Sequence, residues 1–303
     1  MKLYGGIEAG GTKFICVIGH GPDHIVAEAR IATTTPAETI GYTIEFFQRH
    51  AQEYPISAVG IGSFGPVDLD RSSPTYGYIT TTPKPGWAQA NLCGAIQQAL
   101  HVPVAFDTDV NAAAFGEHYW VPENRALDPL LYLTIGTGIG LGVIVNGKPL
   151  HGLLHPEAGH MLLPHDRTLD PFVGSCPFHG DCWEGLASGP ALEKRWQQRG
   201  ETLPPDHAAW QLEAHYVALA VVNLIYCFSP QRVVLGGGVM QQPGIIDRVR
   251  GAVQRTINNY LQTDRITRDI QQLIAPPGLG NRSGVLGAIA LAATVARMNH
   301  APE

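Results

Sequence analysis

Several features that would place this chain in a specialised class are missing from it. Charged residues make up only 15% of its 303 residues, the net charge is −6, and no run of like charges occurs. This balance argues against general binding to nucleic acid or to a membrane surface. No uninterrupted apolar run reaches the roughly 18 residues needed to span a bilayer. No secretion signal is expected either, because residues 1–4 lead directly into a glycine motif. We therefore expect a cytoplasmic protein.

Cysteine is also scarce, with five residues in the chain. Cys16, Cys93 and Cys227 lie singly in apolar surroundings, which predicts small buried core residues in a reducing compartment. What the chain does have is 45% hydrophobic residues, enough for a sizeable globular core and for two ordinary domains.

A strand, a glycine-rich turn and a second strand occur twice, at residues 3–18 and again at 130–145. Each copy heads a series of alternating strands and helices, and a helix is expected from Thr35 and Pro36 to about Tyr54. Longer helices are expected at 208–228, 244–261 and 285–298. The duplication predicts an α/β fold of two related lobes with a cleft between them.

Three glycine turns follow strands of this repeat. Backbone amides in such turns can point together at an anion, and the missing side chains let a phosphate approach closely. The candidate phosphate-binding residues are Gly10, Gly11, Thr12 and Lys13 in the first turn, Gly136, Thr137, Gly138 and Gly140 in the second, and Gly237 and Gly238 in the third. Neither of the first two turns fits the Walker or Rossmann pattern, and an ordinary strand-to-helix turn is the alternative for the third.

A pair of carboxylates, Asp107 and Asp109, lies where a short apolar strand meets a helix-like segment. Open α/β folds place their chemistry at such strand ends. A carboxylate that lies between phosphate-binding turns along the chain suits a general base that activates a hydroxyl for attack on a nucleotide phosphate. We favour Asp109 as the base, and expect a structural role for Asp107.

The two remaining cysteines suggest a metal site. Cys176, His179 and Cys182 have the spacing Cys-x2-His-x2-Cys, and His160 lies upstream. Two thiolates and two imidazoles form a closed tetrahedral zinc set, which is structural because no position is left for a reactive water. His155 or His165 could replace His160, and the alternative is a polar loop without metal.

Glu157 and Glu184 flank this segment. Their carboxylates could accept hydrogen bonds from the hydroxyls of a sugar, or could be solvated surface charges.

Together these motifs resemble the ROK family (repressors, open reading frames and kinases) of the sugar kinase–actin-like superfamily, which has a ribonuclease H-like fold. The resemblance covers essentially the whole chain. It rests on the segments 6–13, 136–140, 157–160, 182–185 and 235–239. It implies a discontinuous N-terminal lobe of residues 1–115 and 287–303. It also implies a C-terminal lobe of residues 116–286 that carries a zinc loop at 155–185.

Three departures from the family's common glucokinases are similar to its bacterial fructokinase branch. They are Thr108 in place of Asn, Glu8 in place of Asp, and His179 in place of Cys. The Thr108 change leaves open how the sugar hydroxyl normally held by the asparagine is bound. The resemblance therefore implies an ATP-dependent fructokinase that phosphorylates the 6-hydroxyl of D-fructose, with Asp109 as general base.

The resemblance also implies the remaining sites. Sugar contacts are expected from Gly65, Asn111, Glu157, His160 and Glu184, and the glycine turns hold ATP. Glu8 is a candidate for holding Mg²⁺ through water. His160, Cys176, His179 and Cys182 would bind structural zinc. The family suggests a homodimer.

Two alternatives remain open. One is a kinase for another hexose, such as glucose, mannose or an N-acetyl hexosamine, and the other is a sugar sensor without catalysis. A DNA-binding repressor is not expected, because the first phosphate motif begins within ten residues of Met1.

Overall fold

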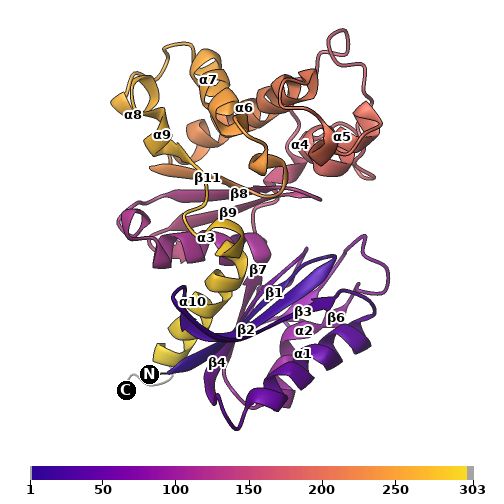
Figure 1. The fold of residues 1–303 in the computed structure, drawn as a ribbon, viewed down its shortest axis with the longest axis vertical. Coiled ribbons are helices and arrows are strands. Elements are labelled where there is room, and N and C mark those ends of the chain that lie inside the picture. The colour runs from indigo at the N-terminus through magenta and orange to yellow at the C-terminus, as the bar shows by residue number, and fades with distance from the viewer. Residues whose placement is uncertain (1, 299–303) are drawn as a thin grey trace. The chain divides into compact units, whose positions relative to one another are not determined.

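The computed structural model describes residues 2–298 (Figure 1). The chain divides into two compact units. Over the described residues, the first unit comprises 2–126, 147–155 and 282–298, and the second comprises 127–146 and 156–281. The boundaries expected from the sequence, at 115/116 and 286/287, are wrong in position. They fall inside helices α3 (Asp109–Trp120) and α10 (Ser283–Met298), each of which belongs whole to the first unit.

The first unit is built on a mixed sheet with the strand order β3-β2-β1-β4-β7. Its strands are β1 (Leu3–Ala9), β2 (Lys13–Gly21), β3 (His24–Ala32), β4 (Ile56–Ser63) and β7 (Val104–Thr108). β1, β4 and β7 run parallel, and their registers pair Ala9 with Ser63 and Ser63 with Thr108. The first glycine turn and the segment that begins at Asp109 therefore leave the sheet at the same edge.

Two further helices complete the first unit with α3 and α10. They are α1 (Pro36–His50) and α2 (Leu92–Leu100), and a small hairpin of β5 (Tyr78–Ile79) and β6 (Ala90–Asn91) lies between β4 and α2. α1 begins as expected, because Thr35 Oγ1 accepts from the backbone amide of Glu38 at 3.4 Å. It ends at His50, earlier than the sequence suggested. Apolar side chains of the sheet, α1 and α2 form one buried core that includes Phe14, Ile61 and Phe106.

α10 packs against α3, β1 and β4 at a distance that only glycine allows. A Cβ atom on Gly287 would lie 1.7 Å from the carbonyl oxygen of Ala112 in α3, and one on Gly60 of β4 would lie 1.9 Å from that of Ala288. Backbone thus meets backbone on both sides of α10. The last described helix is therefore part of the support of α3, whose first residue is Asp109.

The second unit repeats the opening topology of the first. β8 (Leu130–Ile135) and β9 (Ile139–Val145) form an antiparallel hairpin around the second glycine turn, as β1 and β2 do around the first. β8 then pairs in parallel with β11 (Arg232–Gly236), which pairs in parallel with β12 (Ile274–Ala275). β10 (Lys148–Pro149) falls in the stretch counted with the first unit. The predicted duplication is confirmed, and the fold is the two-unit α/β fold expected.

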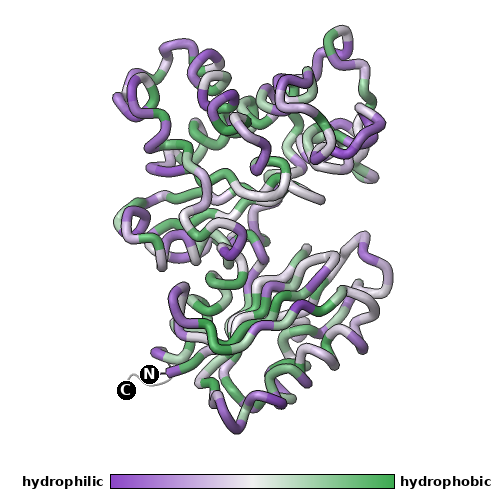
Figure 2. The backbone as a smooth tube through the Cα atoms, viewed as in Figure 1, coloured by the Kyte–Doolittle hydropathy of each residue, from purple (hydrophilic) through white to green (hydrophobic). Residues whose placement is uncertain are grey.

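The rest of the second unit includes two long α-helices and four shorter ones. The α-helices are α4 (Trp183–Ala187), α5 (Gly189–Trp196), α6 (Ala208–Phe228), α7 (Ile245–Ile257), α8 (Asp264–Thr267) and α9 (Ile270–Leu273). Single 3-10 turns in this unit are η2 (Ala158–His160), η3 (Gly200–Thr202) and η4 (Val239–Gln241). A further one, η1 (Pro122–Asn124), belongs to the first unit, and η5 (Gly280–Arg282) spans the boundary between the units. Figure 2 shows hydrophobic segments concentrated along the strands, with polar segments in the outer loops. α7 ends at Ile257, before the predicted end at Leu261.

Helix α6 is long and apolar enough to cross a membrane by length and composition. It nevertheless packs against α7 and α4 and has an extensive buried face, so it serves as a core helix of the second unit. Cys227 lies on its exposed side, so the prediction of a buried Cys227 is wrong, whereas Cys16 and Cys93 are buried as predicted. The helix also buries Glu213 (1% exposed), and neither carboxylate oxygen has a hydrogen-bond partner among the described residues.

Candidate functional site

Asp109 is the first residue of α3, directly after β7. Thr108 caps the helix, its Oγ1 accepting from the backbone amide of Asn111 at 3.0 Å. One carboxylate oxygen of Asp109 accepts from the backbone amide of Val110 at 2.9 Å, and the residue is partly exposed. The positive end of a helix stabilises an ionised carboxylate. Asp109 thus presents an accessible carboxyl group at a strand-to-helix junction.

Asp107 occupies the opposite environment, almost fully buried at 3% exposure. Its Oδ1 accepts from the backbone amide of Thr108 at 2.8 Å and from Nδ2 of Asn111 at 2.7 Å. Its Oδ2 accepts from Nε2 of His151 at 3.0 Å. Both oxygens of Asp107 are therefore engaged by protein donors, which fits a structural role and distinguishes Asp107 from the more accessible Asp109. His151 could not be predicted as a partner of Asp107, because nothing in its spacing relates the two residues.

The first glycine turn is held by its neighbours rather than by its own side chains. The Gly10 amide donates to the carbonyl of Lys13 at 3.0 Å, and Thr33 Oγ1 donates to the carbonyl of Gly10 at 2.7 Å. The backbone amide of Thr33 donates to the carbonyl of Thr12 at 3.0 Å. A Cβ on Gly11 would meet no atom within 4 Å, so the turn offers open backbone to an approaching anion.

Glu8 lies at the end of β1, against the start of α10. A Cβ on Gly284 would lie 2.7 Å from its Cδ, so glycine makes room for this carboxylate. Burial raises the pKa of Glu8, while the charge of Lys13 and the backbone amide of Val285 act to lower it. Its Oε2 is buried and has no hydrogen-bond partner among the described residues. An acceptor of this kind fits a role in holding water on a cation.

Gly65 lies after β4 and beside His155. A Cβ on Gly65 would come within 3.6 Å of Cε1 of His155, and the Nε2 of this histidine accepts from the backbone amide of Val67 at 3.2 Å. His155 therefore belongs to the first unit and is absent from the Cys/His group described below.

The second glycine turn, in the second unit, is tied to Glu184. The carboxylate of Glu184 accepts from the backbone amide of Ile139 at 2.9 Å, and a Cβ on Gly138 would lie 2.8 Å from the same oxygen. The turn itself is closed by the Gly136 amide, which donates to the carbonyl of Gly138 at 2.9 Å. Gly140 pairs within the β8–β9 hairpin. Glu184 therefore connects the predicted phosphate turn with the predicted sugar-binding segment.

The third glycine turn closes against the second. Gly237 has φ +91°, and a Cβ there would lie 2.3 Å from the carbonyl oxygen of Ile135, so only glycine fits. Gly238 is open. A cavity of about 650 Å³ lies beside both turns. It is lined by Gly136, Thr137, Gly189, Pro190, Leu192, Glu193, Arg199, Gly200, Glu201, Trp210, Gly238, Val239, Gln241 and Gln242. Its size suits a nucleotide.

Glu157 and Glu184 influence one another electrostatically. Desolvation first, and then the charge of Glu184, raise the pKa of Glu157 to about 7, although part of the Glu157 side chain remains exposed to solvent. Two carboxylates close enough to influence one another can accept hydrogen bonds from neighbouring hydroxyl groups.

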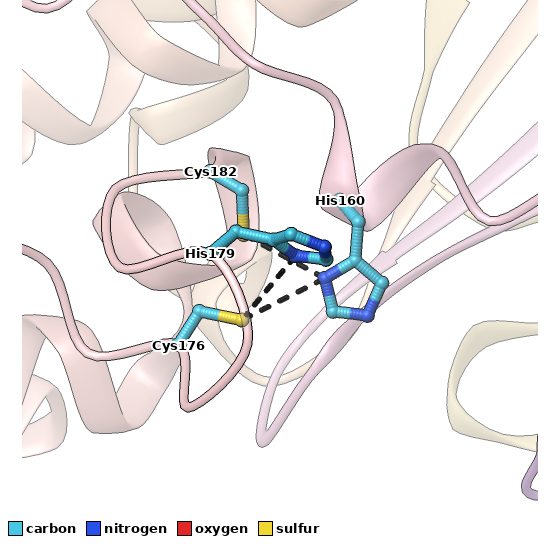
Figure 3. A group of neighbouring side chains, drawn as sticks. All are labelled: His160, Cys176, His179 and Cys182. Carbon is cyan, nitrogen blue, oxygen red and sulfur yellow. Dashed lines mark hydrogen bonds between the residues drawn. The ribbon is translucent and has the colours of Figure 1, made fainter. Parts of the chain in front are cut away.

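Figure 3 shows the four side chains expected to bind metal, all in the second unit. The ligand atoms of His160, Cys176, His179 and Cys182 lie within 4.8 Å of one another. His160 Nδ1 is 3.8 Å from the sulfur of Cys176 and 3.6 Å from that of Cys182. Two sulfurs and two imidazole nitrogens at this mutual spacing fit a tetrahedral divalent ion.

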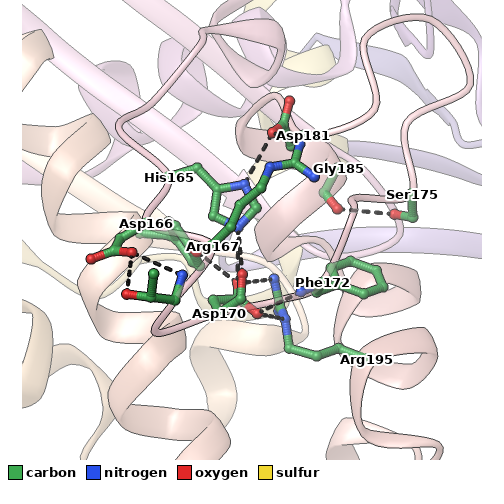
Figure 4. A network of polar contacts seen from close by, with 11 residues as sticks. His165, Asp166, Arg167, Asp170, Phe172, Ser175, Asp181, Gly185 and Arg195 are labelled. Carbon is green, nitrogen blue, oxygen red and sulfur yellow. Dashed lines mark hydrogen bonds and ion pairs between the residues drawn. The ribbon is translucent and has the colours of Figure 1, made fainter.

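His165, the other alternative ligand, is engaged elsewhere. Its Nδ1 lies 3.0 Å from Asp181 Oδ2, and its Nε2 lies 2.9 Å from the carbonyl of Asp170. Asp170 also receives bonds from Arg195 and from the hydroxyl of Tyr216 at 2.6 Å. This polar network, drawn in part in Figure 4, holds the segment that carries the Cys/His group. No sequence motif indicated it.

Comparisons with known proteins agree with this arrangement. The model of the ROK family matches residues 4–295. A fructokinase of Streptococcus mutans is 44% identical over 97% of this chain and 99% of its own length. A fructokinase of Zymomonas mobilis is 43% identical over 96% of each chain. The crystal structure of a ROK hexokinase from Thermus thermophilus is 26% identical and superposes with a TM-score of 0.77 over 98% of this chain and 99% of its own.

Two duplicated hairpins carry glycine turns, a third turn closes a nucleotide-sized cavity, and an accessible carboxylate begins α3. The family match spans nearly the whole chain. The chain therefore belongs to the ROK family, among its sugar kinases.

Proposed function

We propose that this protein is an ATP-dependent fructokinase that transfers a phosphoryl group to the 6-hydroxyl of D-fructose. The observation that carries the proposal is the accessible, helix-capped carboxylate of Asp109, beside a buried Asp107 that is already committed to three hydrogen bonds. The choice of fructose is supported by relatives named fructokinase at 43–44% identity.

Asp109 accepts the proton of the sugar 6-hydroxyl as that oxygen forms its bond to the γ-phosphorus. The bond from phosphorus to the bridging oxygen breaks at the same time, and ADP leaves. Backbone amides of the turns at Gly10–Lys13 and Gly136–Gly140 hold the phosphates, and the cavity beside Gly238 takes the nucleoside. Glu8 would hold Mg²⁺ through water, and the ion would supply positive charge that neutralises the phosphates.

Asn111, Gly65, Glu157, His160 and Glu184 are proposed to hold the sugar. The raised pKa of Glu157, about 7, keeps one carboxyl of its pair able to donate while Glu184 accepts. His160 also belongs to the Cys/His group, so we propose that zinc bound there fixes its ring. Zinc would have a structural role, since the four side chains leave it no open position. We further propose a cytoplasmic location and a homodimer.

The test is Asp109→Asn in a coupled ADP-release assay over fructose, glucose, mannose and N-acetyl hexosamines. General-base catalysis is typically worth about 10²–10⁴-fold, so kcat is expected to fall by at least about 100-fold without loss of folded structure. Asp23→Asn, at an exposed position in the β2–β3 turn, serves as the control. Normal turnover in Asp109→Asn would refute the assignment of the base.

The same panel tests the sugar. A preference for another hexose would support the proposed kinase activity but refute fructose as its substrate. Sugar binding without any ATP turnover would favour a sensor. Turnover with fructose at the highest kcat/KM is the expected result.

A further inference from the structure

The side-chain oxygen Oδ1 of Asn111, two residues after Asp109, is buried and accepts no hydrogen bond from any described residue. The residue is fully buried, with 0% of its surface exposed. A buried acceptor that is left without a donor destabilises the folded protein. Since nearly all buried polar atoms in native proteins are paired, this one points to a partner that arrives with a ligand.

The orientation of this amide is set by chemistry rather than by chance. Nδ2 of Asn111 donates to Oδ1 of Asp107 at 2.7 Å, and a carboxylate oxygen can only accept. Rotating the amide by half a turn would bring two acceptors together, so Oδ1 must face away from Asp107. The backbone amide of Asn111 is fixed as well, by the Oγ1 of Thr108.

His151 completes the arrangement from a different segment. Its Nε2 donates to Oδ2 of Asp107 at 3.0 Å, while Oδ1 of Asp107 serves Asn111 and the backbone of Thr108. Each oxygen of this buried carboxylate therefore has its own donors. The side chain of His151 is 41% exposed and that of Asp107 only 4%, so the histidine closes the solvent side of the buried carboxylate. The bond to Asp107 raises the pKa of His151.

We propose that His151 is a positioning residue for sugar recognition. Through Asp107 it holds the amide of Asn111 so that Oδ1 accepts the hydrogen of one hydroxyl of the hexose. Thr108 already uses its oxygen to cap α3, which leaves Asn111 Oδ1 as the neutral side-chain acceptor at this end of the helix. The inference rests on the proposed kinase function and adds the pair of residues that orients a sugar contact.

The first experiment compares His151→Leu with His151→Gln, using calorimetric binding of fructose, glucose and mannose together with steady-state kinetics. His151→Leu is expected to weaken binding of the preferred hexose by about 10-fold and to raise its KM equally, with the KM for ATP unchanged. His151→Gln keeps an amide donor and is expected to stay within about 3-fold of the parent. His24→Leu, at the exposed first residue of β3, is the matched control.

The second experiment identifies the contact itself with monodeoxy analogues of the preferred hexose. One analogue is expected to bind the parent protein at least about 10-fold more weakly than the full sugar. In Asn111→Leu, which is close in volume, that difference should disappear, because the acceptor is gone.

The outcomes separate the two claims. Unchanged sugar affinity in His151→Leu, or an equal loss in His151→Gln, would overturn the positioning role. A preference for glucose or mannose, with the His151→Leu loss intact, would leave this inference standing and refute the choice of fructose. If no hexose binds the parent protein, both the proposed function and this inference fail.

Discussion

The carboxyl of Glu213 should make the stability of this protein depend on pH in a way that one substitution removes. Glu213 is 1% exposed within α6, and neither oxygen has a partner among the described residues. Burial raises its pKa well above the ordinary value of 4.5, although the charge of Arg195 opposes this. Folding therefore favours the protonated form.

The sign follows from proton linkage. The folded state keeps this proton to higher pH than the unfolded chain does, so stability is greatest below pH 4.5 and falls as pH rises toward the folded pKa. The slope for one proton is about 1.4 kcal/mol per pH unit. With an unfolding entropy of about 0.6 kcal/mol/K for the 303-residue chain, this amounts to about 2 °C per pH unit. The slope would be about twice as steep if the second unit unfolds by itself.

The assay is thermal unfolding of the parent and of Glu213→Gln at pH 5.5, 6.5 and 7.5. The Tm of the parent minus that of the variant should fall by about 2 °C for each unit, until the folded pKa is passed and the difference becomes constant. Asp206→Asn, an exposed carboxyl in the same unit, should show no such trend. A difference in Tm that does not change with pH would refute the assignment of a raised pKa to Glu213.

Two further predictions concern the metal group and the helix contact. One equivalent of zinc is expected by elemental analysis, and Cys176→Ser should lose it and lower the Tm by at least about 5 °C, since structural zinc contributes directly to folding. Cys227→Ser, at an exposed position, should keep the zinc and the Tm of the parent protein. A parent protein that binds no metal would contradict the proposed zinc site. Gly287→Ala should lower the free energy of unfolding by at least about 2 kcal/mol, because its Cβ would lie 1.7 Å from a backbone oxygen. Gly41→Ala in α1, with open space around it, should be neutral or stabilising, and equal effects of the two changes would argue against the close packing of α10.

The fold was largely predictable because its strongest signals are local. Glycines flanked by apolar runs predict both strand-turn-strand copies, and Thr35 and Pro36 predict the start of α1. The ends of helices were less well predicted. α1 ends at His50 although Tyr54 and Pro55 suggested a later end, because no glycine or proline lies at the true end.

Parts of the site that depend on long-range pairing could not be predicted. His151 lies 44 residues from Asp107, and Tyr216 lies 46 residues from Asp170, so no spacing rule connects them. Cys227 was misplaced because apolar neighbours in sequence do not say which side of a helix is buried. The grouping of His160 with Cys176, His179 and Cys182 could be proposed, since most of its ligands lie within one short segment. Only the structure shows His155 and His165 engaged elsewhere.

The close packing of α10 has a consequence for how the protein is made. The first unit takes its sheet from the start of the chain, but its last helix is synthesised after every other described element. Until residues 283–298 emerge, the glycine faces of β4 and α3 have no backbone to pack against. All of the second unit, which ends at Asn281, is therefore synthesised before the helix that closes the packing of α3 and β4. The packing around α3, which carries the proposed base, is thus the last part of the described structure for which all residues become available.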